Sequence, residues 1–297
     1  MPPSPSAELR AAVAGVRAFV LDADGVLLFK GAPISGSAEA IAELRSRGLP
    51  YRVVTNYSSA HRSSLAAAFG KATGLEVDGA EIITAASAAA AYTAREHPGG
   101  AILVLGTPDA RREWAGQEIL SADEADARSQ AIAAVVIGDA GDDLSFRNLD
   151  IAFRQLRNGA AFVAMHRNPW WLTPKGFTLD AGAVVAGLEF ALGRRAVICG
   201  KPSPVVFRQA LGELRDQVAG GTAPAGQASG SAGPRLRAAD VVMVGDDPKA
   251  DIAAARRVGL RGVLVTTGKS TRAEALAAGV PATNIAGSLR EVVAALG

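Results

Sequence analysis

Residues 18–26 read AFVLDADGV. An apolar run ends in Asp22 and Asp24 and then reaches a glycine, which is how a buried parallel strand places an active site at its carboxyl end. Two carboxylates this close repel each other and disturb each other's proton affinity, so the pair indicates a chemical use. A divalent cation would relieve the repulsion.

The pair on its own has two other interpretations. An EF-hand also begins Asp-x-Asp-Gly, but it needs further oxygen ligands and a glutamate at its twelfth position, whereas residues 26–29 are the apolar VLLF. The second interpretation is a turn that ends the strand with both carboxylates solvated, and the Asp22/Asp24 pair taken alone does not exclude it.

Composition narrows the class of protein. The chain has 297 residues, 49% hydrophobic and 20% charged, enough for one large core or two modest ones in a soluble globular protein. Its net charge of +2 comes from charges spread along the chain, so we expect no nucleic-acid partner. No leader or membrane-spanning stretch is evident, so we expect no membrane partner and a cytoplasmic location. The single Cys199 lies in an apolar run and fits a reducing compartment.

The fold class expected from the periodicity is α/β, a Rossmann-like arrangement of mostly parallel strands. Ser37 is expected to cap a helix that reaches Arg47, and a second helix over 145–157 has Phe146, Leu149, Phe153 and Leu156 at helical spacing. A Gly/Ala-rich segment at 220–234 reads as a flexible loop. Strands are expected at 18–22, 51–55, 102–105, 135–137, 161–164, 197–199, 241–244 and 262–265.

Three more motifs follow expected strands. Thr55-Asn56 offers a hydroxyl and an amide to an anion, or else caps a helix. In GKPSP (200–204), prolines hold Lys201 along the sheet edge and Ser203 caps a helix; a solvated lysine in a rigid turn is the alternative. In VGDDPKAD (244–251), Asp246 and Asp251 can face one cation while Asp247 caps a helix.

Charge links these motifs if their strands are neighbours. Four carboxylates and a phosphate in one crevice require a cation such as Mg²⁺ together with a cationic side chain, and Lys201 is at the right edge. The inventory suits phosphoryl transfer: Asp22 attacks phosphorus to give an aspartyl-phosphate, and Asp24 serves as acid and then as base. Donors from Thr55, Asn56 and Lys201 would stabilise the phosphoryl oxygens.

The four motifs, in this order, resemble those of the haloacid dehalogenase (HAD) superfamily of phosphohydrolases. The resemblance implies that Asp22 is the nucleophile and Asp24 the acid/base, and that Thr55 and Lys201 bind the phosphoryl group. It also implies that Asp246 binds Mg²⁺ with the side chain of Asp22 and the backbone carbonyl of Asp24. Asp251 would support that metal site.

The long separation between Thr55 and Lys201 requires an inserted domain. It resembles the C2 cap of subfamily IIA, the NagD type, and especially the group of phospholysine phosphohistidine inorganic pyrophosphate phosphatase. The expected division is a core over 1–85, a cap over 86–195 and the rest of the core over 196–297. In the cap, a candidate leaving-group pocket consists of His166, Arg167, Trp170 and Asp180, with Lys175 nearby. The alternative is that Trp170 and Trp171 cover the cap sheet and that His166 and Arg167 are solvated.

The expected function is therefore Mg²⁺-dependent hydrolysis of a small phosphomonoester. Several members of the pyrophosphate and phosphoamide branch have serine where this chain has Asp24, and an alkyl ester needs an acid more than those substrates do. A pyrophosphate or phosphohistidine phosphatase is the alternative. A dehalogenase would not need Asp24 or the metal cluster, so these residues argue against that activity. A non-catalytic protein that binds a phosphorylated ligand is not excluded by the sequence. The resemblance also allows a homodimer through the cap.

Overall fold

The protein is described by a computed structural model over residues 5–74, 76–173, 176–220 and 235–297. It divides into two compact units: one holds Met1–Thr55, Ala66–Ile82 and Phe207–Gly297, and the other Asn56–Leu65 and Ile83–Val206. Of the loop expected over 220–234, Gly220 is the last residue of a helix, and residues 221–234 lie outside the described residues, as does Lys175. The domain boundaries expected after residues 85 and 195 stay predictions. Among the described helices, none is long and apolar enough to cross a membrane.

The first unit is built on a six-stranded sheet with the order β15-β14-β13-β1-β4-β5. Strand β1 runs parallel to both of its neighbours, β13 and β4, and all five of its residues are buried. The carboxyl ends of β1, β4 and β13 therefore meet at one edge of the sheet. The strands are β1 (Ala18–Asp22), β4 (Tyr51–Val54), β5 (Ile82–Ile83), β13 (Val241–Gly245), β14 (Arg261–Val265) and β15 (Ile285–Ala286), with a small hairpin of β2 (Leu28–Phe29) and β3 (Ala32–Pro33).

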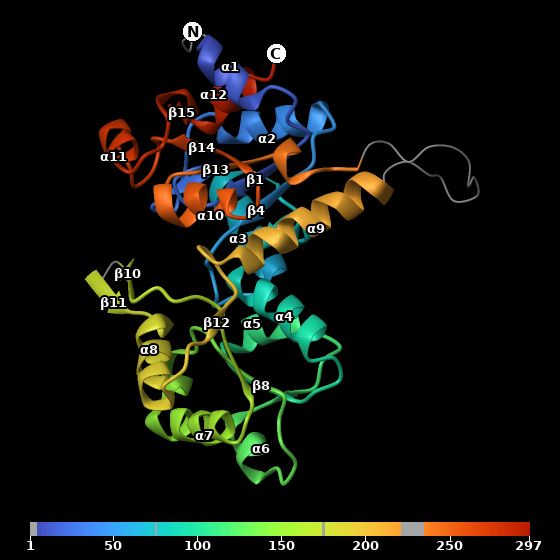
Figure 1. Cartoon of the computed structure of the whole chain (residues 1–297), viewed down its shortest axis with the longest axis vertical. Helices are drawn as coiled ribbons and strands as arrows, with labels where there is room; N and C mark the ends of the chain where they lie inside the picture. Colours follow the sequence, from blue (N-terminus) through green and yellow to red (C-terminus); the bar gives the residue numbers. More distant parts are fainter. Residues whose placement is uncertain (1–4, 75, 174–175, 221–234) are drawn as a thin grey trace, which may run out of the picture. The chain divides into compact units, whose positions relative to one another are not determined.

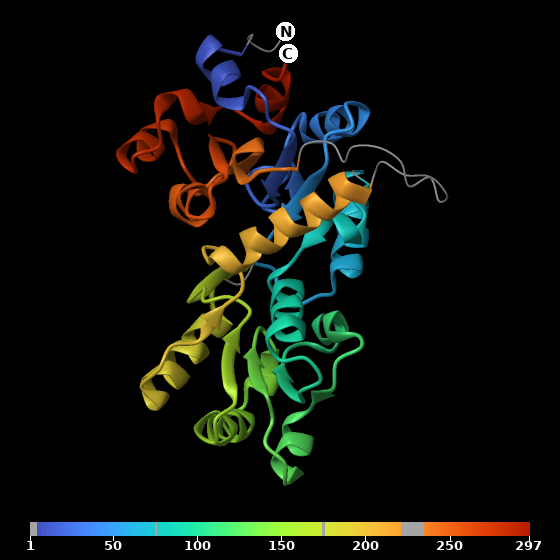
Figure 2. The same cartoon turned by 45° about the vertical axis from the view of Figure 1, so that its right-hand side comes forward.

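Helices cover both faces of this sheet, as α/β crossovers require. Helices α2 and α12 lie together on one face and α10 on the other (Figures 1 and 2). The helices with residues in this unit are α1 (Ala7–Val13), α2 (Ser37–Ser46), α3 (Arg62–Thr73), α9 (Pro204–Gly220), α10 (Ala254–Arg256), α11 (Arg272–Ala277) and α12 (Leu289–Ala294). Short turns of helix are η1 (Gly79–Glu81), η4 (Ala238–Asp240), η5 (Pro248–Ala253) and η6 (Ala282–Asn284).

The second unit has its own five-stranded parallel sheet in the order β12-β9-β8-β6-β7. Its strands are β6 (Ile102–Leu105), β7 (Ile119–Leu120), β8 (Ala134–Ile137), β9 (Ala161–Ala164) and β12 (Val197–Ile198), and β10 (Trp170–Thr173) and β11 (Gly176–Leu179) form a separate antiparallel hairpin. The helices are α4 (Ala85–Glu96), α5 (Pro108–Arg111), α6 (Ala122–Ala127), α7 (Phe146–Arg157) and α8 (Ala181–Leu192), with η2 (Arg112–Trp114) and η3 (Gly141–Leu144).

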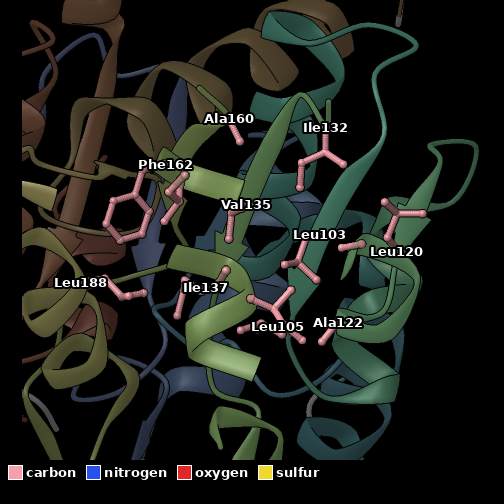
Figure 3. Packing of buried hydrophobic residues seen from close by; sticks show 14 of the residues in the cluster. Leu103, Leu105, Leu120, Ala122, Ile132, Val135, Ile137, Ala160, Phe162 and Leu188 are labelled. Atoms are coloured by element: carbon pink, nitrogen blue, oxygen red, sulfur yellow. The ribbon is translucent and has the colours of Figure 1, made fainter. Parts of the chain in front are cut away.

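Alternate residues of the central strands build the core of the second unit. Leu103 and Leu105 of β6 and Val135 and Ile137 of β8 point to the same face, because side chains alternate along a strand. Figure 3 shows them gathered with Leu188 of α8. Each fully buried leucine of such a cluster contributes about 1.5–3 kcal/mol relative to an exposed one, so this unit has a core of its own.

The fold class is confirmed, and the expected strands lie within one residue of their predicted bounds. One local prediction, the Ser37 cap, was wrong. Gly36, in the left-handed region at φ 82°, is the N-cap of α2, and the Ser37 hydroxyl instead donates to the carbonyl of Leu27 at 3.2 Å. The helix expected over 145–157 is confirmed as α7, with Ser145 as its N-cap, and its first residue, Phe146, is 87% exposed.

Candidate active site

Asp22 ends the central strand of the first unit. Its side chain is buried, and Oδ1 accepts a hydrogen bond from the Ala23 N–H at 2.7 Å. Within the sheet, Leu21 is in register with Val244 of β13, and Asp22 with Val54 of β4. The residues that follow β13 and β4 therefore begin beside Asp22.

Asp24 lies in the loop after β1 and is exposed. The next residue, Gly25, is at φ +80°, and its N–H bonds back to the carbonyl of Leu28. A methyl group built on Gly25 would collide with the Asp246 carboxylate. Glycine is therefore required at this position, because only a residue without a side chain lets the Asp246 carboxylate lie against the loop.

Asp246 and Asp251 come from the turn after β13, and both are almost fully buried. Asp246 accepts the Lys269 N–H at 2.6 Å, and Asp251 accepts the Asp247 N–H at 3.1 Å. The predicted cap is confirmed, because the Asp247 side chain accepts the N–H groups of Lys249 and Ala250 at the start of η5.

Asp22, Asp246 and Asp251 form one cluster. One carboxylate oxygen of each lies within 4.8 Å of the others. Three buried carboxylates at this distance repel strongly, and an all-oxygen donor set suits a hard divalent cation. The residues therefore fit a site for Mg²⁺. Among the described residues the Asp24 carboxylate is not in this cluster, so a contribution of Asp24 to the metal would come from its backbone carbonyl.

The remaining phosphate-binding candidates divide between the two units. Thr55 is buried directly after β4 in the first unit. Asn56 and Lys201 belong to the second unit, where the Asn56 side-chain amide donates to the Lys201 carbonyl at 2.9 Å. Lys201 is 5% exposed, and α9 begins at Pro204 as expected, with the Ser203 hydroxyl accepting the Val205 N–H.

His166 of the cap candidates is buried rather than solvated, at 2% exposure. Its Nε2 lies 2.9 Å from the Ser58 hydroxyl and 3.5 Å from Asp180 Oδ1. Burial lowers the pKa of the imidazole below its ordinary value of 6.5, and the carboxylates of Asp180 and Asp139 offset part of that effect. The alternative that His166 is solvated is wrong.

Arg167 points to a buried acid. Its guanidinium donates to Glu189 Oε2 at 2.7 and 3.1 Å, and Arg195 binds the same oxygen at 2.8 Å. Burial alone would raise the pKa of Glu189, but hydrogen bonds from the Ala196 N–H and the two arginines together lower it. Arg167 thus has a structural role in pairing this carboxylate.

Trp170 and Asp180 lie at the open end of the β10–β11 hairpin, where the Asp180 N–H donates to the Pro169 carbonyl at 3.1 Å. Trp170 is 55% exposed and packs edge-on against Phe177 of β11 at 4.8 Å between ring centroids. It lines a hollow of about 560 Å³ with Leu179 and Ala183. Asp180 is the N-cap of α8 and accepts the Ala181 N–H.

Three parts of the chain that contact the candidate site residues were not predicted from the sequence. The loop after β14 places Gly268 and the Lys269 N–H against Asp246, and its position at a strand end was a usable signal. Ser58 and Glu189 were missed because their partners are distant in sequence, and no local pattern marks such a pairing.

Comparisons with known proteins agree with this geometry. A family model described as haloacid dehalogenase-like hydrolase matches residues 19–119, and a HAD-hydrolase-like model matches residues 198–292. The human phospholysine phosphohistidine inorganic pyrophosphate phosphatase is 32% identical over 263 residues, covering 86% of this chain and 85% of that protein. NagD from Escherichia coli K-12 has a TM-score of 0.76 at 27% identity, covering 93% of this chain and 98% of that one.

A third similar protein was solved with a metal. The glycerol phosphate phosphatase Rv1692 from Mycobacterium tuberculosis, in complex with magnesium, has a TM-score of 0.74 at 27% identity and covers 94% of this chain and 76% of that one. The chain therefore belongs to the haloacid dehalogenase-like hydrolase family, among its phosphatases, with the core and inserted cap of the NagD type.

Proposed function

We propose that this protein is a Mg²⁺-dependent phosphohydrolase that acts on a small phosphomonoester through an aspartyl-phosphate at Asp22. The observation that carries the proposal is the buried cluster of Asp22, Asp246 and Asp251 at the end of β1, with Asp24 exposed two residues away. A nucleophile held in a cation site, next to a carboxyl group that is free to reach solvent, is the arrangement that phosphoryl transfer needs.

In this mechanism Asp22 attacks phosphorus in line with the leaving oxygen. The P–O bond to the leaving group breaks as Asp24 gives its proton to that oxygen. Asp24, now a carboxylate, removes a proton from water, which attacks the aspartyl-phosphate and releases inorganic phosphate and free Asp22. Asp22, Asp246 and Asp251 would hold Mg²⁺, which supplies charge neutralisation and Lewis acidity when bound.

The phosphoryl oxygens need hydrogen-bond donors as well as the metal. Thr55 directly follows β4, whose last residue, Val54, is in register with Asp22 of β1. We assign the Thr55 hydroxyl, the Asn56 amide and the Lys201 ammonium to the phosphoryl group.

The chemistry of Asp24 favours phosphomonoesters as substrates. An alkoxide is a strong base and leaves poorly without a proton, so an acid at this position matters most for an ester. The similar protein from Mycobacterium tuberculosis is named a glycerol phosphate phosphatase, and this supports that class. A pyrophosphate or phosphohistidine substrate is the second candidate, because the human relative at 32% identity is named for it.

The test is inorganic phosphate release from a panel of alkyl and aryl phosphates, pyrophosphate and phosphohistidine, with Mg²⁺ or with chelator. The proposal expects release that is lost with chelator and with Asp22→Asn, and faster turnover of esters. Asp216→Asn, the same substitution on an exposed face of α9, is the matched control and should behave as the wild type. Metal-dependent binding of phosphate without turnover of any compound would support a binding protein instead. Pairing of two chains through the cap stays a prediction that sedimentation would test.

A further inference from the structure

The two ring nitrogens of His166 have different partners. The Asn168 N–H donates to Nδ1 at 3.3 Å, and Nε2 faces the Ser58 hydroxyl at 2.9 Å and Asp180 Oδ1 at 3.5 Å. Because a backbone N–H can only donate, Nδ1 carries no proton, and the proton of the neutral ring is on Nε2. His166 therefore donates its hydrogen bond toward Ser58.

Ser58 is the next member of this network. Its side chain is 5% exposed, and its oxygen also accepts the Asp139 N–H, which follows β8, at 3.4 Å. His166 follows β9, so the ends of two neighbouring strands fix Ser58. Ser58 lies two residues after Asn56, so the segment that carries Asn56 is held from the sheet of its own unit.

The same strand end also holds the segment of Lys201. The Gly200 N–H donates to the Met165 carbonyl at 2.7 Å, and the Asn56 amide donates to the Lys201 carbonyl at 2.9 Å. A methyl group on Gly200 would lie 2.6 Å from Asn56 Oδ1 and 2.8 Å from the Met165 carbonyl oxygen, so these segments are in close contact. Residues 165–166, 56–58 and 200–201 thus contact one another in a closed ring.

We propose that His166 is a positioning residue for Lys201, acting through Ser58 and Asn56, and not a contact for the leaving group. The inference rests on the proposed function, in which Lys201 binds the phosphoryl group. A displacement of about 1 Å in a catalytic group can cost about 100-fold in rate. Loss of the His166–Ser58 bond therefore lowers turnover of every substrate by the same factor, because the phosphoryl group is common to all of them.

The test compares three variants over the panel of esters. His166→Leu removes the donor at similar size, Ser58→Ala removes the acceptor, and His166→Gln keeps an N–H near the position of Nε2. We expect His166→Leu and Ser58→Ala to lower kcat by about tenfold or more with an unchanged ranking of substrates, and His166→Gln to stay within about threefold of the wild type. The double variant should lose no more than the single ones. His97→Leu is the matched control outside this network and should leave kcat unchanged.

Hydrogen exchange gives a second readout that does not need activity. The Gly200 amide should exchange faster in His166→Leu and Ser58→Ala than in the wild type, and His166→Gln should restore its protection. Failure of the wild type to release phosphate would refute the proposed function, while the exchange data would still test the coupling between His166 and the Lys201 segment. Unchanged exchange together with wild-type kcat in Ser58→Ala would overturn the inference. A loss of turnover confined to some leaving groups would also overturn it, because it would make His166 a leaving-group contact.

Discussion

Replacement of Asp251 by asparagine tests the cation site through stability alone. Asp251 is fully buried, and its Oδ2 accepts the Asp247 N–H at 3.1 Å, a bond that an amide oxygen can also accept. The substitution thus removes one negative charge from the cluster with little change in shape. It should therefore raise the free energy of unfolding of the metal-free protein and reduce the further stabilisation that Mg²⁺ gives.

The magnitude follows from the distances in the cluster. At an effective dielectric constant of about 20, two charges at the 4.8 Å limit repel by about 3.5 kcal/mol, and Asp251 takes part in two such pairs. Hydrogen bonds, other neighbours and solvent offset most of this repulsion. We therefore expect Asp251→Asn to raise the free energy of unfolding of the metal-free protein by about 1–3 kcal/mol. The wild type should gain about 2.7 kcal/mol from Mg²⁺ at a hundred times its Kd, and the variant well under half of that.

Urea unfolding with chelator and with saturating Mg²⁺ measures both effects. Asp216→Asn, on an exposed face of α9, should show the full stabilisation by Mg²⁺. An Asp251→Asn protein that is less stable than the wild type in chelator, and yet gains the full stabilisation from Mg²⁺, would refute the reasoning that these carboxylates share one cation.

Three further predictions concern single residues. Gly268→Ala should weaken Mg²⁺ binding by about tenfold in calorimetry, because the added methyl group collides with a carboxylate of the cluster; unchanged affinity would contradict this. Asp24→Asn should lower kcat for an alkyl phosphate by about 10²–10⁴-fold. Rapid mixing with p-nitrophenyl phosphate should still give a burst of about one nitrophenol per enzyme, because nitrophenolate leaves without needing a proton. A burst rate reduced by the same factor as kcat would count against Asp24 as the acid. Burial lowers the pKa of His166, although the carboxylates of Asp180 and Asp139 oppose that shift. The unfolded chain therefore binds more protons than the folded one, and the free energy of unfolding should fall as the pH drops below about 6.5, by at most about 1.4 kcal/mol per pH unit. The pH dependence of chemical unfolding should be shallower in His166→Gln.

The core of the candidate site was readable from the sequence because its signals are local. Asp22, Thr55 and Asp246 each follow an apolar run directly, and parallel strands bring such positions to one edge of the sheet. The structure adds that Gly25 and Gly268 make room for Asp246. Gly25 and Asp246 are more than 200 positions apart in sequence, so no short pattern could reveal that contact.

The roles of the cap residues were harder to predict from the sequence, because these residues contact partners that are distant in sequence. His166 was grouped with Arg167 as a pocket residue because the two are adjacent and polar. The structure separates them: one donates toward Ser58, and the other pairs with Glu189. Both pairings join residues of different elements, and periodicity reports only which face of its own element a residue lies on. Burial of the histidine was likewise decided by tertiary packing.

Chemical trapping of the aspartyl-phosphate tests the central claim most directly. Asp24→Asn is mixed with Mg²⁺ and p-nitrophenyl phosphate, quenched with acid, reduced with borohydride and digested for mass spectrometry. Removal of the base slows hydrolysis of the intermediate, so the phosphorylated enzyme should accumulate. We expect reduction to convert residue 22, and no other aspartate, into homoserine. A burst of nitrophenol with residue 22 unmodified, or with homoserine at another aspartate, would contradict the assignment of Asp22 as the nucleophile.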